Sequence, residues 1–138
     1  MKVINNRYFG EIKINNMKLI FHLANIILII LYLFPGSLLG CFLYKNCQIQ
    51  PQLTPDFIVS SNHVFAFTLI SILGLLSYSK KKISKKMIFY LFFMSFFLEL
   101  THLMNPSRGF EIGDLAGNIV GVLFSYLIYL LLKLKKNK

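Results

Sequence analysis

Four long apolar segments take up most of this chain and constrain its fold more than any other feature. They run approximately over residues 17–34, 57–79, 83–104 and 112–134. A helix needs about 20 mostly apolar residues to cross the hydrocarbon core of a bilayer. Because only 14% of the residues are charged, a soluble domain of this size would lack the polar surface that it needs. We therefore predict an all-α integral membrane protein with four transmembrane helices, organised as one domain over residues 1–138.

The positive charges predict how the four helices are oriented. Four Lys or Arg residues lie before or at the start of the first segment, five lie in the link between the second and third segments or just after it, and four lie at the end of the last segment or beyond it. Only Lys45 and Arg108 remain for the other side. Since cytoplasmic loops carry the excess of Lys and Arg, both the N and C termini are predicted to be cytoplasmic. The links 35–56 and 105–111 then face outward. The net charge of +10 is explained by this asymmetry, so we expect no nucleic-acid partner.

Two cysteines, Cys41 and Cys47, fall in the first outward link. A disulfide is chemically permitted on that side of the membrane, but we expect two free thiols. The run Leu38-Leu39-Gly40-Cys41 also resembles a lipoprotein cleavage site, although cleavage there would remove the first span. Tyrosines near the predicted helix ends, Tyr32 among them, are expected to act as interfacial anchors.

The polar residues of the later segments lie at one depth, near their outward ends. His63 lies six residues inside the second segment. Glu99 and His102 lie near the end of the third segment, and Asp114 and Asn118 lie near the start of the fourth. This common depth predicts a polar cluster on the extracytoplasmic side of the bundle. Ionisable residues inside a membrane are costly and usually functional, so a protein-lined pocket is the expected environment.

Residue spacing supports that pocket. Glu99 and His102 are three residues apart, and Asp114 and Asn118 are four apart, so each pair shares one helix face. On the neighbouring stripe, small residues at intervals of four allow two helices to approach closely in lipid, and here they are the helix-packing residues Gly113, Gly117 and Gly121. Arg108, in the outward link, is expected to close over the pocket and pair with Glu99 or Asp114.

Structural roles compete with each functional one. As alternatives, Asp114 could cap the N-terminus of the fourth helix, Asn118 could join helices, and Arg108 and Glu111 could form a solvated pair of little energetic value. The ligand spacing within one helix that marks many zinc sites is absent. We therefore expect neither a metal nor another cofactor.

The motif from the third segment onward resembles that of the VanZ-like membrane proteins. It comprises Glu99-x-x-His102, Pro106-x-Arg108 and the spaced residues Asp114, Asn118 and Gly121, with His102 where the family has glutamine. The segment NHVFAF also places His63 on a histidine of that family. The resemblance covers roughly residues 50–125. It implies a multi-pass protein of the bacterial cytoplasmic membrane, and some family members are linked to resistance to teicoplanin, a glycopeptide antibiotic.

Two functions follow from these residues as hypotheses. In the first, an envelope protein binds or modifies a membrane lipid or a lipid-linked envelope precursor, with Arg108, Asp114 and Asn118 as ligand-binding residues. The alternative is an intramembrane hydrolase or transferase acting on a lipid-linked phosphate or ester. There, His63 or His102 would act as general acid or base, Glu99 would orient it, and Arg108 would stabilise developing charge. The ligand and the oligomeric state cannot be derived from the sequence.

Overall fold

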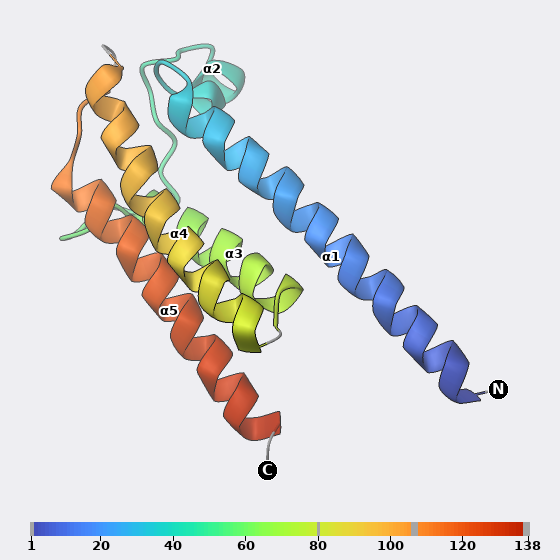
Figure 1. Ribbon diagram of the computed structural model, residues 1–138. Coiled ribbons are helices and arrows are strands. Elements are labelled where there is room, and N and C mark those ends of the chain that lie inside the picture. Colours follow the sequence, from blue (N-terminus) through green and yellow to red (C-terminus); the bar gives the residue numbers. More distant parts are fainter. Residues whose placement is uncertain (1, 80, 106–107, 137–138) are drawn as a thin grey trace.

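The computed structural model describes residues 2–79, 81–105 and 108–136, with side chains for 14–79, 82–105 and 108–135 (Figure 1). These residues contain no strand. They form helices α1 (Lys2–Leu33), α2 (Leu38–Tyr44), α3 (Ser61–Ser77), α4 (Lys81–Thr101) and α5 (Ile112–Lys136), with a short 3-10 turn η1 (His102–Met104) after α4. The expected all-helical fold is therefore confirmed for the part of the chain that the structure describes.

Three of the helices are long and apolar enough to cross a membrane. The spans are Ile14–Leu33 in α1, Lys82–Met104 in α4 with η1, and Ile112–Lys135 in α5. Helix α3 is also apolar but has only 17 residues, which places it at the lower limit for a spanning helix. The α1 helix begins well before the apolar segment predicted from residue 17. It also includes the more polar residues ahead of the span.

The second predicted helix corresponds to α3, and it is shorter than predicted because hydrogen bonds to the loop before it fix where it begins. Asp56 accepts a hydrogen bond from the backbone N–H of Ser61 at 2.7 Å, and the Ser61 hydroxyl donates to the carbonyl of Thr54. The side-chain amide of Asn62 accepts a hydrogen bond from the N–H of Leu53 and donates one to the carbonyl of Pro51 in the same loop. These bonds satisfy polar groups at the start of α3, so the helix begins at Ser61 and leaves Phe57 outside it, 98% exposed.

The link after α1 contains a feature that contradicts our expectation of free thiols. Cys41 and Cys47 form a disulfide with their Cα atoms 4.2 Å apart. The chain reverses after α2 because Lys45 adopts a left-handed conformation with φ of 53°. Gly36, at φ of 98°, lets the N–H of Ser37 donate to the carbonyl of Cys47 at 2.7 Å. This local turn geometry, which hydropathy does not encode, brings the two sulfurs together.

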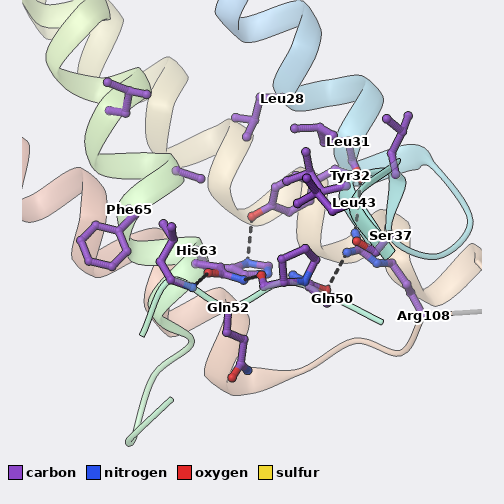
Figure 2. Close-up of a pocket in the computed structure, with 17 residues that line it drawn as sticks. Leu28, Leu31, Tyr32, Ser37, Leu43, Gln50, Gln52, His63, Phe65 and Arg108 are labelled. Atoms are coloured by element: carbon purple, nitrogen blue, oxygen red, sulfur yellow. Dashed lines mark hydrogen bonds between the residues drawn. The ribbon is translucent and has the colours of Figure 1, made fainter. Parts of the chain in front are cut away.

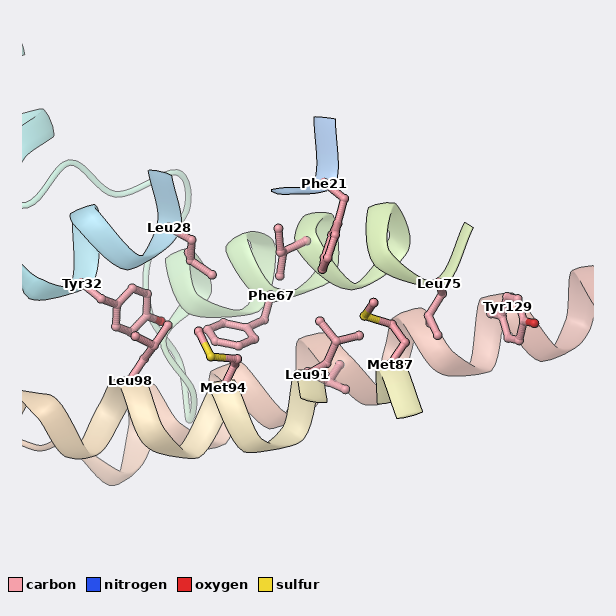
Figure 3. Close-up of a cluster of buried hydrophobic side chains, with 12 residues drawn as sticks. Phe21, Leu28, Tyr32, Phe67, Leu75, Met87, Leu91, Met94, Leu98 and Tyr129 are labelled. Atoms are coloured by element: carbon pink, nitrogen blue, oxygen red, sulfur yellow. The ribbon is translucent and has the colours of Figure 1, made fainter. Parts of the chain in front are cut away.

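The helices form a bundle, and α2 lies at one end of it (Figure 1). Figure 1 shows both chain termini at one end and α2 at the opposite end, which we call the α2 end. Helix α3 packs most extensively against α5, and α1 contacts α3 and α4. Figure 3 shows the core running between the helices along the length of the bundle. Its most completely buried apolar side chains are Phe21, Phe67, Leu75, Leu91, Leu98 and Val122.

The outer faces of the same helices carry large apolar side chains that remain exposed. Examples lie on α1 (Leu19, Ile27), α4 (Phe89) and α5 (Leu131), each more than half exposed. A soluble protein rarely exposes so much contiguous apolar surface. This arrangement fits helices that face lipid, in agreement with their length and hydropathy.

Two of the three predicted packing glycines bring α5 against α3. A Cβ atom on Gly117 would lie 2.7 Å from the carbonyl oxygen of Ser60, and one on Gly121 would lie 2.7 Å from that of Val64. At Gly113 the nearest atom would be 3.8 Å away, an ordinary contact. The close approach of the two helices therefore depends on Gly117 and Gly121 and not on Gly113.

Alanine substitutions at two of these glycines should differ in their effect on stability. Gly121→Ala forces the new methyl group against the α3 backbone, and we expect a cost of about 1–3 kcal/mol, typical of overpacking. Gly113→Ala is the matched control, because its methyl group has room and alanine favours a helix over glycine by about 1 kcal/mol. Denaturant-induced unfolding in mixed micelles measures both. Equal stability of the two variants would contradict this account of the α3–α5 contact.

Candidate functional site

Polar side chains from four helices meet inside the α2 end of the bundle. Glu99 of α4 and Asn118 of α5 are fully buried, and His63 of α3 is 5% exposed. Tyr32 at the end of α1 and His102 of η1 complete the group, at 6% and 2%. The structure thus brings together residues that lie far apart in the sequence but at one predicted depth.

Asn118 connects all the helices of this cluster. Its Oδ1 atom accepts from the Tyr32 hydroxyl at 2.7 Å and lies 3.0 Å from Nδ1 of His63. Its Nδ2 atom donates to the backbone carbonyl of Ser95 at 3.2 Å, which fixes the orientation of the amide. Asn118 therefore joins α5 to α1, α3 and α4 at once.

His63 faces Asp114 with its other ring nitrogen. The distance from Nε2 to Oδ2 of Asp114 is 3.3 Å, and the Asp114 side chain is 21% exposed. Asp114 is the third residue of α5, so it lies inside the helix and is not its N-cap. A carboxylate in the first turn still interacts favourably with the helix dipole.

Glu99 uses only one of its two carboxylate oxygens. Oε1 accepts from the backbone N–H of Glu111 at 3.2 Å and lies 3.3 Å from Nδ1 of His102. Oε2 is buried and has no hydrogen-bond partner among the described residues, and it lies 3.9 Å from Nδ1 of His63. The carboxylate is thus held by one oxygen while the other remains available.

Arg108 does not pair with either acid, contrary to expectation. Its Nη2 donates to Oε1 of Gln50 at 2.9 Å, and its Nη1 lies 3.4 Å from both the carbonyl of Leu31 and Nε2 of His102. A guanidinium can only donate, so Nε2 of His102 accepts and Nδ1 donates to Glu99. Arg108 is therefore coupled to Glu99 through His102 instead of by direct contact.

Tyr32 and Gln50 belong to the site, although the sequence did not single them out for it. The predicted role of Tyr32 as an interfacial anchor is wrong, because its hydroxyl binds His63 at 2.8 Å and its ring stacks on His102 with centroids 5.3 Å apart. Its position at the outward end of the first span, at the depth of the polar cluster, was the sequence feature that could have indicated this role. For Gln50, which lies in a loop, the sequence offered none.

Two cavities meet at this end of the bundle, and Figure 2 shows the larger one. It has a volume of about 420 Å³ and an apolar wall from α1, α2 and α3, including Leu28, Leu39 and Leu69. The smaller cavity has a volume of about 210 Å³ and is lined by polar groups, among them His102, Glu111 and Asp114. Both are lined by Ser37, Gln50 and Arg108. An apolar space and a polar space therefore adjoin at one arginine.

A comparison with protein-family models returned the VanZ/LLP1 model, matched over residues 2–133 of the 138. The chain is a member of the VanZ/LLP1 family. No curated protein and no solved structure matched the chain. The resemblance inferred from the motif is thus confirmed, and family membership together with three apolar spans identifies a membrane protein. Pro106 of the family motif lies outside the described residues.

The VanZ/LLP1 motif residues on α4, η1 and α5 converge on the cluster in this chain, together with Arg108 of the connecting loop. Glu99, His102 and Arg108 form one hydrogen-bonded row, and Asp114 and Asn118 approach His63 from α5. Gly121 is the exception, because it packs against α3; the other motif residues that the structure describes lie in one cluster.

Replacing Asn118 should destabilise the bundle. Asn118→Ala leaves the Tyr32 hydroxyl, Nδ1 of His63 and the Ser95 carbonyl without their shared partner, and we expect a cost of about 1–2 kcal/mol, as for other buried polar contacts in membrane bundles. Val120→Ala is the control, because Val120 lies on the same helix and is 42% exposed. Unfolding in mixed micelles compares the two. A loss no larger for Asn118→Ala than for Val120→Ala would show that the network contributes little.

Proposed function

We propose that this VanZ/LLP1 family member is a multi-pass protein of the bacterial cytoplasmic membrane that binds an anionic, lipid-linked component of the cell envelope. One observation carries the proposal: Arg108 and Gln50 line both the apolar cavity of about 420 Å³ and the polar cavity of about 210 Å³. An amphiphile with an acidic headgroup has both parts that such a pair of spaces would accept. Binding sites for small ligands are commonly apolar with a few placed polar groups.

The proposed topology has four spans, with α3 as the short one, and the α2 end facing away from the cytoplasm. Three features support it. The positive charges collect at the other end, both termini lie at that end (Figure 1), and the Cys41–Cys47 disulfide lies at the α2 end. Disulfides persist in oxidising compartments and are rare in the cytosol.

Thiol labelling tests this topology without removing native cysteines. Because both native cysteines are bonded to each other, the described chain has no free thiol. A membrane-impermeant maleimide applied to intact cells should label a Phe57→Cys variant, whose position is 98% exposed. A Lys82→Cys variant should react only after the membrane is permeabilised. The opposite pattern would reverse the proposed orientation.

In the proposed binding mode the anionic group lies near Arg108 and the hydrocarbon follows the leucine-lined wall. The wall residues Leu39 and Leu69 are at least half exposed on the lipid-facing side, so an acyl or polyprenyl chain could enter from the bilayer. Such a protein would contribute to teicoplanin resistance by binding an envelope precursor, or by altering how the precursor is presented at the membrane surface.

Native mass spectrometry of gently extracted protein tests the binding. We expect a co-purified anionic lipid, and we expect Arg108→Ala to weaken binding of an added polyprenyl phosphate by about 10- to 100-fold, because a hydrogen bond to a charged group contributes about 1.5–3 kcal/mol. Lys45→Asn is the matched control: Lys45 is a cation near the same end but lines neither cavity. Asparagine also tolerates the left-handed conformation found there.

Equal losses in the Arg108 and Lys45 variants would indicate general attraction to anionic lipid and would contradict a specific site. Unchanged binding in Arg108→Ala would likewise remove Arg108 from the proposal.

The contact between His63 and Asp114 favours a second candidate, an intramembrane hydrolase or transferase. A histidine oriented by a carboxylate 3.3 Å away is a common general acid or base. His63 lines the larger cavity and Asp114 lines the smaller one. In this case Glu99 and His102 would support proton transfer while Arg108 stabilises charge on the phosphate or ester. Turnover of the bound lipid, seen as a new mass in the same spectra, would distinguish catalysis from binding.

A further inference from the structure

His63, Glu99 and Asp114 come from three helices and place one potential ligand atom each within 4.8 Å of the others. We propose that these three residues bind one divalent transition-metal cation, with Zn²⁺ as the best-suited ion. Zinc accepts imidazole nitrogen and carboxylate oxygen as ligands. This inference is independent of the lipid proposed above, since it rests on the side chains of the cluster alone.

The state of Glu99 supports a bound cation. Its side chain is fully buried, yet Oε2 lacks a hydrogen-bond partner among the described residues. An unpartnered oxygen of a buried carboxylate costs several kcal/mol unless a cation or donor satisfies it. Oε1 is meanwhile held by the Glu111 N–H and by His102. The carboxylate is therefore oriented by one oxygen, and its other oxygen faces the imidazole of His63, 3.9 Å from Nδ1.

The hydrogen bonds of His63 also support a bound metal ion. The Tyr32 hydroxyl donates its one hydrogen to Asn118 Oδ1, and that amide oxygen can only accept. Both groups around Nδ1 of His63 therefore need a proton from it. With the proton on Nδ1, Nε2, which faces Asp114, offers its lone pair to a cation. Histidines that bind metals characteristically donate their other ring N–H to a neighbouring acceptor in this way.

The distance between two of the ligand atoms and the charge of the cluster fit zinc as well. Two ligand atoms bound to zinc at about 2.0–2.2 Å in tetrahedral geometry lie roughly 3.4 Å apart, and Nε2 of His63 is 3.3 Å from Oδ2 of Asp114. Two carboxylates also balance the charge of a divalent cation, which lowers the cost of burying charge in a membrane. A neutral site of this kind would suit the interior of the bundle.

Three protein ligands leave a fourth tetrahedral position. Asp114, the outermost of the three at 21% side-chain exposure, also lines the polar cavity of about 210 Å³. That cavity provides an entry path for the ion and room for water or an anionic ligand on the open side. Zinc sites with three protein ligands and one open position are typical of catalytic zinc, whereas structural sites are closed.

Zinc titration of purified protein tests the site. Full-length protein in detergent is stripped with a chelator and titrated with Zn²⁺ against a fluorescent competitor, and bound zinc is counted by elemental mass spectrometry after desalting. We expect one equivalent per chain. Asp114→Asn should weaken the affinity at least 100-fold, and Tyr32→Phe, which removes only the hydroxyl beside Nδ1 of His63, should weaken it 10- to 100-fold.

Two control variants test specificity. Glu111→Gln alters an acid of the same cavity that lies outside the triad, and His22→Asn removes a histidine bound to Tyr78; both should keep one equivalent. Zinc uptake that is lost equally in the controls, or is unchanged in Asp114→Asn and Tyr32→Phe, would overturn the proposal. So would the absence of saturable uptake by the unmodified protein, since the triad would then be an ion-paired histidine. Circular dichroism of each variant verifies that it is folded, and Tyr32→Phe keeps the test valid if Asp114→Asn does not fold.

Discussion

A polar side chain inside a helical membrane protein must find its partner within the protein, and this constraint organises the α2 end of the bundle. Asn118 meets it by contacting three other helices at once. Each of these contacts specifies one rotation of α5 about its own axis. That rotation also turns Gly117 and Gly121 toward α3, where there is no room for a side chain. The polar network and the glycine stripe thus select the same helix arrangement by two independent means, a consistency expected of a sequence that encodes one fold.

The helices and the depth of the polar residues could be predicted from the sequence, because both follow from one-dimensional spacing. Segment length and hydropathy located the spans of α1, α4 and α5, and counting residues from the helix ends placed His63, Glu99 and Asn118 at one level. The start of α3, the Cys41–Cys47 disulfide and the contacts of Gln50 could not be derived this way. They depend on the path of the links, which is set by hydrogen bonds such as that of Asp56 and by two residues with positive φ. Tyr32 was misassigned for a related reason: sequence position gives depth in the membrane but not whether a side chain points to lipid or inward.

The position of Arg108 explains how one site could serve two chemistries. If Arg108 were paired with Glu99 or Asp114, as spacing alone indicated, its charge would be neutralised within the protein. Instead it contacts Gln50, a backbone carbonyl and His102, all of them uncharged acceptors in this arrangement. Its positive charge therefore remains uncompensated by direct contact at the junction of the two cavities. A cation held in this way by neutral groups favours an anion there, and the row from Arg108 through His102 to Glu99 would transmit that binding to the buried carboxylate.

The placement of Arg108 also determines which charges surround the two acids. With Arg108 engaged elsewhere, Glu99 and Asp114 have His63 as their shared basic neighbour. A protonated His63 would offset one of the two carboxylates and leave a net negative charge in a low-dielectric setting, where charge is expensive. A divalent cation would offset both and would use Oε2 of Glu99, the atom that the protein leaves without a partner. The hydrogen bonds that hold Nδ1 of His63 through Tyr32 and Asn118 are then the means of presenting Nε2 to the ion. In this reading the polar network has two roles: it selects the helix arrangement, and it orients the ligands of a cation that neutralises the charge the bundle has buried.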